Sequence, residues 1–99
     1  MAKFDVYRNP EGPGYLLDCQ ADLLSGLNTR FVVPLLPVGV APPPAVRLNP
    51  AFEIVGQRFV MVTQFAGTIA RKQLGSRIAS LLAEDVTITD AIDMLLSGY

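Results

Sequence analysis

The end of the chain carries the strongest periodic pattern in the sequence. Within Thr87–Tyr99, apolar side chains recur at the spacing of one face of an α-helix, at Ile88, Ala91, Ile92, Leu95, Leu96 and Tyr99. A helix of about ten residues is marginal by itself in water. The rest of the chain must therefore offer this helix an apolar surface, and we expect Ile88, Ile92 and Leu95 to be buried against it.

Both ends of this predicted helix carry recognisable signals. Thr87 and Asp90 have the spacing of a capping box, in which the hydroxyl and the carboxylate satisfy free backbone N–H groups. Asp90 would also place negative charge in the first helical turn, where the helix dipole favours it. Gly98 suits a left-handed helix end. The pattern predicts a helix that stops one residue before the last residue of the sequence.

The residues before the helix favour strands. Strand-like runs occur at Lys3–Tyr7, Tyr15–Cys19, Thr29–Leu36, Phe52–Gln64 (a hairpin turning near Gly56) and Thr68–Gly75. Pro34 cannot donate a ladder hydrogen bond, so we expect its strand to end, bulge or lie at an edge there. The Pro-rich segment Ala41–Ala45 should be a stiff spacer between two strands. Arg77–Leu82 could be a helical turn or a linker. Strands followed by one helix predict a single β-rich α+β domain, a twisted sheet or partial barrel.

The side-chain inventory excludes several kinds of site. The chain has no histidine and one cysteine, which excludes cysteine/histidine zinc sites and a histidine-based triad. Cys19 is therefore interpreted as a small core residue. Asp90 and Asp93 are interpreted as helix charges rather than an acid–base pair. Arg71 and Lys72 form a weak phosphate patch, because neighbouring residues of a strand point to opposite faces. We expect no metal, no cofactor and no catalytic residue.

Charge and hydropathy bear on partners and location. The formal net charge is −1, which does not favour general binding to nucleic acid. The charged residues after Arg77 are all acidic, namely Glu84, Asp85, Asp90 and Asp93; they suit a basic partner surface or a solvated helix face. No apolar run approaches the roughly 20 residues of a membrane span. With a single cysteine and no apolar core of a signal peptide in the first residues, we expect a cytoplasmic protein without membrane contact.

Three blocks of the sequence together resemble the CcdB family of plasmid-maintenance toxins. The first is Phe4–Arg8. The second runs from Leu17–Leu24 (LDCQADLL) into Thr29–Leu35 (TRFVVPL). The third is Leu48–Pro50 leading to Gly56–Thr63 (GQRFVMVT), followed by the terminal helix. The resemblance covers essentially the whole chain, residues 1–99, as a single domain.

The resemblance implies a fold and a mode of action. Proteins of this family have an SH3-like barrel with a five-stranded antiparallel sheet, a small three-stranded sheet and a C-terminal α-helix. They form a homodimer that binds the A subunit of DNA gyrase and traps the enzyme on cleaved DNA. A CcdA-like antitoxin neutralises them, and they catalyse nothing themselves. The expected partners are thus a second copy, gyrase and an antitoxin.

The family's contact residues can be carried over to matching positions. The gyrase contacts correspond to Leu23, Leu24, Asp93, Leu96, Ser97, Gly98 and Tyr99. The family ends in Trp-Gly-Ile, where this chain has Ser97-Gly98-Tyr99, so the aromatic anchor is missing at Ser97. Tyr99 could replace it through a turn at Gly98, or could pack on the domain. The antitoxin contacts are expected in two loops, at Arg8, Asn9, Pro10, Glu11, Pro42, Pro43 and Pro44.

Two alternatives follow from the same resemblance. A MazF-like endoribonuclease toxin would share this fold, and Arg30, Arg71 and Lys72 would be its candidate residues. The departure at Ser97 instead favours a chromosomal relative that has lost toxicity and only binds antitoxin. The acidic balance of the chain argues against RNA as a substrate.

Overall fold

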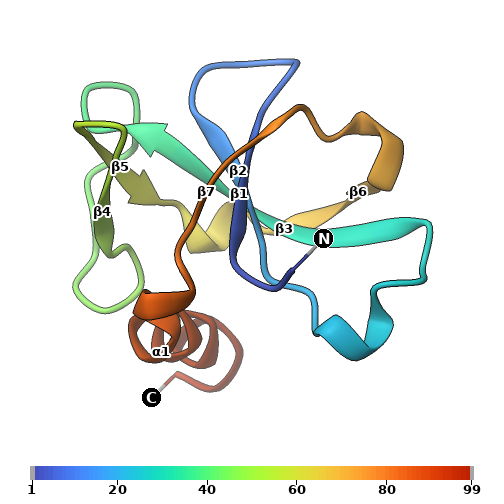
Figure 1. The fold of residues 1–99 in the computed structure, drawn as a ribbon. Helices are drawn as coiled ribbons and strands as arrows, with labels where there is room; N and C mark the ends of the chain where they lie inside the picture. Colours follow the sequence, from blue (N-terminus) through green and yellow to red (C-terminus); the bar gives the residue numbers. More distant parts are fainter. Residues whose placement is uncertain (1, 99) are drawn as a thin grey trace.

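The computed structural model describes residues 2–98 and contains seven strands and one α-helix (Figure 1). The strands are β1 (Asp5–Arg8), β2 (Tyr15–Asp18), β3 (Thr29–Pro37), β4 (Ala51–Ile54), β5 (Gln57–Met61), β6 (Gly67–Ala70) and β7 (Arg77–Ser80). Helix α1 covers Asp85–Ser97, and short 3₁₀ turns lie at η1 (Asp22–Leu24), η2 (Thr63–Phe65), η3 (Arg71–Gln73) and η4 (Leu82–Glu84). The predicted α+β, mainly β class is confirmed.

The strands form one curled antiparallel sheet in the order β4-β5-β3-β2-β1-β7, with β6 also paired to β3. β3 organises the sheet because its two halves have different partners. Its first half, Thr29–Val32, pairs with β6, and its last part, Leu35–Pro37, pairs with β5. The five strands β6-β3-β2-β1-β7 and the three strands β3-β5-β4 are therefore two parts of one sheet that share β3. This is the expected five-stranded and three-stranded arrangement.

Pro34 lies in the middle of β3, so the prediction that the strand ends, bulges or reaches an edge there is wrong. Pro34 pairs with Leu16 of β2, and its carbonyl accepts a hydrogen bond from the N–H of Val62 at 3.0 Å on the other side. In an antiparallel ladder the N and O of a residue face the same neighbour. The missing N–H of Pro34 therefore faces the gap between the end of β5 at Met61 and the start of β6 at Gly67, and no ladder bond is lost.

The segment before the helix differs from the expectation. Arg77–Ser80 is a strand, β7, which pairs with β1 through Asp5↔Ser80 and Val6↔Ala79; the predicted helical turn or linker is wrong. The predicted strand Thr68–Gly75 is confirmed only in its first part, since β6 ends at Ala70. Arg71 and Lys72 lie in the tight turn η3. The argument that a strand splits these two cations between opposite faces therefore does not apply.

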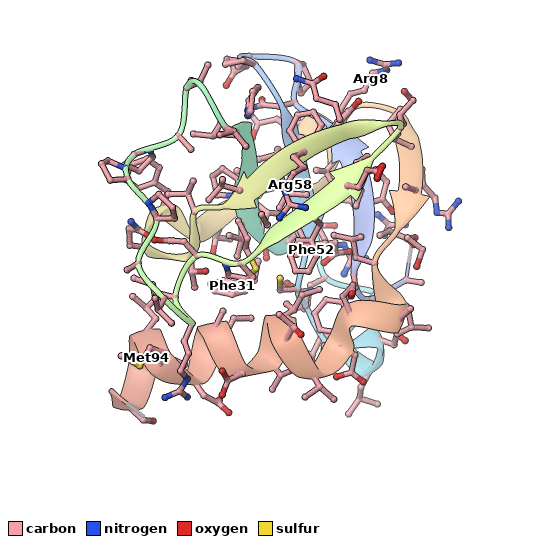
Figure 2. The ribbon with its side chains drawn as sticks, turned by 90° about the vertical axis from the view of Figure 1, so that its left-hand side faces the viewer. Arg8, Phe31, Phe52, Arg58 and Met94 are labelled. Carbon is pink, nitrogen blue, oxygen red and sulfur yellow. The ribbon has the colours of Figure 1, made fainter. Side chains whose placement is uncertain are left out.

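Helix α1 lies across one end of the curled sheet and closes the core, with Phe31 and Phe52 between the strands and the helix (Figure 2). Ile88 and Ala91 are fully buried and Ile92 packs against the same core. Leu95 is 41% exposed, so its predicted burial is wrong. Toward the end of α1 the sheet covers fewer helix residues, so the last turn projects into solvent.

The helix starts earlier than predicted. It begins at Asp85, directly after η4, and its N-cap Glu84 makes no side-chain capping bond. The Thr87–Asp90 capping box is therefore wrong, because both residues are inside the helix, and Asp85 is the acid of the first turn. The helix end is as predicted: Gly98 has φ 79°, and its N–H donates to the carbonyl of Met94 at 3.0 Å.

Among residues 2–98, the helices are all too short or too polar to cross a lipid bilayer.

Candidate functional site

The last turn of α1 presents the side chains that the family resemblance assigns to gyrase binding. Leu96 is 75% exposed, and Asp93, Ser97 and Gly98 are exposed too. The left-handed turn at Gly98 ends the helix in solvent. Tyr99, the proposed substitute for the missing aromatic anchor, lies outside the described residues. The helix end thus displays an apolar side chain beside an acidic one on a rigid element.

The other two predicted gyrase contacts lie on η1. Leu23 is 94% exposed and Leu24 is half exposed, although leucines usually avoid such positions. The backbone of this loop is held from behind. Gln20 Nε2 donates to the carbonyl of Leu24 at 3.0 Å, and Arg30 Nη2 donates to the carbonyl of Ser25 at 2.6 Å. These hydrogen bonds hold the loop in one conformation, in which Leu23 points into solvent.

One chain does not bring these two groups together. η1 lies to one side of α1 in Figure 1 and near the start of the helix in Figure 2, whereas Met94, close to the helix end, lies at the opposite end of the helix in Figure 2. Within a single chain, Leu23 and Leu24 form one exposed apolar site and Leu96 forms another.

A buried ion pair lies under η1, and the sequence reasoning missed it. Arg30 on β3 is 1% exposed, and its Nε lies 3.9 Å from Oδ2 of Asp18 on β2. Burial raises the pKa of Asp18, against the lowering effects of the Gln20 N–H and of Arg30. The sequence feature that indicates this pair is a charged residue inside each of two apolar runs, at Asp18 and Arg30. The pair links β2 to β3 directly beneath the loop that connects these two strands.

One acidic residue of α1 forms an ion pair. Asp90 accepts two hydrogen bonds from Arg47, from Nε at 3.0 Å and from Nη2 at 2.8 Å. Hydrogen bonding to Arg47 lowers the pKa of Asp90, as expected for a carboxylate beside a guanidinium. This pair fastens the connection between β3 and β4 to the helix. Asp93 is then the exposed acid of the helix end.

The predicted antitoxin contacts lie elsewhere on the molecule. Arg8 projects from the end of the molecule opposite α1 (Figure 2). Arg8 and Asn9, with Pro37 and Phe59, line a cavity of about 320 Å³ between the β1–β2 loop and the start of β5. Pro10 and Glu11 are exposed in the same loop. Pro42, Pro43 and Pro44 are part of the β3–β4 connection and are not among the residues that line this cavity.

Cys19 behaves as the sequence predicts. Its side chain is buried in the core, and burial raises the pKa of its thiol to about 12. A thiol with so high a pKa is protonated at neutral pH and is a poor nucleophile. Cys19 is therefore a packing residue.

Comparison with solved structures shows which proteins share this fold. One similar structure is described as "Endoribonuclease in complex with its cognate antitoxin from Mycobacterial species". It has a TM-score of 0.77 and 16% identity, with 97% of this chain and 94% of that chain covered. A second, "Endoribonuclease from Mycobacterial species", has a TM-score of 0.78 and 15% identity, with 97% and 90% covered. At these identities the likeness concerns the fold alone.

No curated protein matches this chain. The comparison with protein families gives one match, described as "CcdB protein", over residues 3–98. This range includes all seven strands and the whole of α1. The family resemblance inferred from the three sequence blocks is therefore confirmed, and the chain belongs to the CcdB family.

Proposed function

We propose that this chain is the toxin of a type II toxin–antitoxin system that poisons DNA gyrase. In this proposal the protein is a homodimer of single-domain chains without catalytic activity. It binds the gyrase A subunit, traps the gyrase–DNA cleavage complex and is neutralised by a CcdA-like antitoxin. Membership of the CcdB family over residues 3–98 supports this function.

The observation that carries the proposal is the exposed end of α1. Leu96 is 75% exposed on the last turn of a helix whose inward-facing residues Ile88 and Ala91 are fully buried. An apolar side chain on a rigid projecting element is suited to insertion into a partner's pocket. Leu23 on η1 provides a second such side chain. Leu96 and Leu23 lie apart within one chain. Either the two chains of the dimer together present them to the same target, or each side chain acts alone.

The test is a cleavage assay with gyrase from the same source, supercoiled DNA and ATP. After denaturation, linear DNA should accumulate when the protein is added. Ser97→Trp restores the family's aromatic residue and should increase the amount of linear DNA at equal protein concentration. The gain reflects new cation–π and buried aromatic contacts at the interface, up to roughly 4 kcal/mol for an anchor residue. If neither protein yields linear DNA, the gyrase proposal is wrong.

The antitoxin part of the proposal has a separate test. A CcdA-like antitoxin should bind the purified protein, and Arg8→Glu should weaken this binding if the β1–β2 loop is a contact. Arg58→Glu, on β5 and outside the cavity beside Asn9, is a matched charge reversal. Antitoxin binding without any gyrase poisoning would identify the non-toxic relative instead.

An endoribonuclease is the second candidate, because the similar solved structures carry that description. Of the three candidate residues, Arg71 and Lys72 are exposed and could meet a phosphate. Arg30 is 1% exposed and bonded to the loop, so it could not contact RNA without local unfolding. RNA that stays intact with purified protein at low salt would exclude this candidate.

A further inference from the structure

A cavity of about 630 Å³ is lined by none of the predicted gyrase contacts, although its lining residue Arg71 bonds to Ser25 of the η1 loop. Its lining residues come mainly from β1 and from the segment that leaves β6, passes through η3 and turns back toward β7. Figure 1 shows the course of this segment. Its walls include Tyr7, Asn28, Ala70, Arg71, Lys72 and Leu74. The volume is in the range of sites for small molecules. None of its lining residues is part of the predicted gyrase or antitoxin contacts.

The walls of this cavity are held by the backbone on both sides. The N–H of Arg71 donates to the carbonyl of Asn28 at 2.7 Å, which fixes η3 to the start of β3. Gly75 donates to the carbonyl of Arg8 at 3.1 Å, which fixes the return segment to β1. A Cβ at Gly75 would lie 2.7 Å from that carbonyl oxygen, so only glycine allows this approach. The cavity is therefore part of the folded structure.

Its electrostatics favour an anion. Arg71 and Lys72 contribute two positive charges, and the lining residues include no carboxylate. The ion pairs found among residues 2–98 involve Arg30, Arg47 and Arg77, so Arg71 and Lys72 are not neutralised by a salt bridge there. Arg71 makes one long hydrogen bond, from Nη1 to the carbonyl of Ser25 at 3.4 Å. Both cations remain available for a ligand.

The two ends of the cavity differ in chemistry. Arg71 and Lys72 are exposed, whereas Tyr7 is nearly buried and forms an apolar wall together with Ala70 and Leu74. An arginine fork and a lysine are the usual partners of a phosphate group. An apolar wall adjacent to an amide, here that of Asn28, suits a flat base that has polar edges. Inorganic phosphate would fill only the charged end.

We propose that this cavity binds a nucleoside phosphate, with the phosphate on Arg71 and Lys72 and the base against Tyr7, Ala70 and Leu74. The nucleotide could be free or could be one unit of a single-stranded RNA. This differs from a general nucleic-acid surface, which the net charge of −1 disfavours. Only one or two phosphates would be neutralised, so the dependence of affinity on salt should be shallow.

The test is a titration of the full chain, followed by two-dimensional NMR and by calorimetry. The ligands are AMP, GMP, CMP and UMP, with adenosine and inorganic phosphate as fragments. At least one nucleotide should bind at submillimolar concentration and shift the amide signals of Ala70 and Leu74. Each fragment alone should bind at least about tenfold more weakly, because it uses one end of the cavity. A short single-stranded RNA distinguishes the sources: tighter binding than the mononucleotide indicates RNA, and equal binding indicates the free nucleotide.

The variants make the test specific. Lys72→Gln and Arg71→Gln should each weaken nucleotide binding by about tenfold or more, since each removes a charge-assisted contact. Arg58→Gln removes an exposed charge of β5 outside the cavity and should leave the affinity unchanged. If no nucleotide binds at millimolar concentration, or if Arg58→Gln weakens binding as much as Lys72→Gln, the proposal is wrong. Gyrase poisoning is not involved in any of these measurements, so either proposal can fail without the other.

Discussion

The Nε atom of Arg30 lies 3.9 Å from Oδ2 of Asp18, and each side chain is only 2% exposed. The Nε of Arg30 has no hydrogen-bond partner among the described residues, while its Nη2 is used to hold the carbonyl of Ser25. A charge pair this deep and this far apart is costly to desolvate. Its position between β2, β3 and η1 indicates a structural role in shaping the loop.

Arg30→Met should therefore destabilise the fold strongly. The variant leaves Asp18 buried without its partner, and breaking a buried pair from one side costs about 3–5 kcal/mol. The measurement is the free energy of unfolding by urea denaturation. Arg58→Met, at an exposed position, should stay within about 0.5 kcal/mol of the wild type. If both variants lost the same free energy of unfolding, the buried pair would contribute no more to stability than an exposed arginine.

The two paired aspartates should give opposite pH dependences. Burial raises the pKa of Asp18 above its ordinary value of 3.8, so the native state binds its proton more tightly than the unfolded state. The stability of the wild type relative to Asp18→Asn should then fall as pH rises above 3.8. Arg47 lowers the pKa of Asp90, so the stability relative to Asp90→Asn should be fully present above 3.8 and be lost as pH falls below it.

Urea denaturation at several pH values and low salt measures both differences. The Asp90 effect should shrink in about 1 M salt because the pair with Arg47 is exposed, whereas the Asp18 effect should persist. Equal signs for the two variants would contradict the assignment of desolvation to Asp18.

Two glycines with similar backbone angles should respond differently to alanine. Gly14 has φ 82° and Gly56 has φ 76°, so both variants lose about 1–2 kcal/mol from the left-handed conformation. At Gly14 the new Cβ would also overlap the carbonyl oxygen of Leu35, while Gly56 has open space around it. The overlap adds an overpacking cost, for a total of about 3 kcal/mol or more at Gly14. Thermal and urea unfolding of Gly14→Ala and Gly56→Ala would show whether the two losses differ.

Leu96→Asp should abolish gyrase poisoning without weakening the fold. The side chain is 75% exposed, so the folded protein loses little, but a partner pocket that takes leucine would have to bury a charge. Val86→Asp is the matched control, because Val86 is 82% exposed at the other end of the same helix. Linear DNA from the gyrase assay and the unfolding midpoint are measured for both. Loss of activity in both variants, with normal stability, would argue against a specific role for Leu96.

The parts of the fold that local pattern could predict are the strands and the helix with strong periodicity. The hairpin of β4 and β5 around Gly56 and the stop at Gly98 follow from local residue preferences and are confirmed. β7 could not be predicted in the same way. Its residues, Arg77–Ser80, have no strong strand preference, and it becomes a strand by pairing with β1, which is distant in sequence. Pro34 is a similar case, since the sheet accepts a proline there only because β5 ends and β6 begins opposite it.

The candidate site was predictable only as a set of residue types. Leu23 and Leu96 are exposed, and the distance between η1 and the end of α1 depends on the length and direction of the helix, which the residue types do not determine. The cavity beside η3 could not be foreseen. Its cations, Arg71 and Lys72, were assigned to a strand, whereas a tight 3₁₀ turn places both at the rim of the same cavity.

The carbonyl of Ser25 receives hydrogen bonds from two arginines, Arg30 at 2.6 Å and Arg71 at 3.4 Å. The outline of the η1 loop is thus determined by side chains that lie behind it, on β3 and η3. The side chain of Leu23 is 94% exposed and makes none of these hydrogen bonds, and at Leu24 it is the backbone carbonyl, not the side chain, that accepts the bond from Gln20. During evolution, the side chains at positions 23 and 24 could therefore change to suit a different target surface, while Arg30 and Gln20 keep the loop in place.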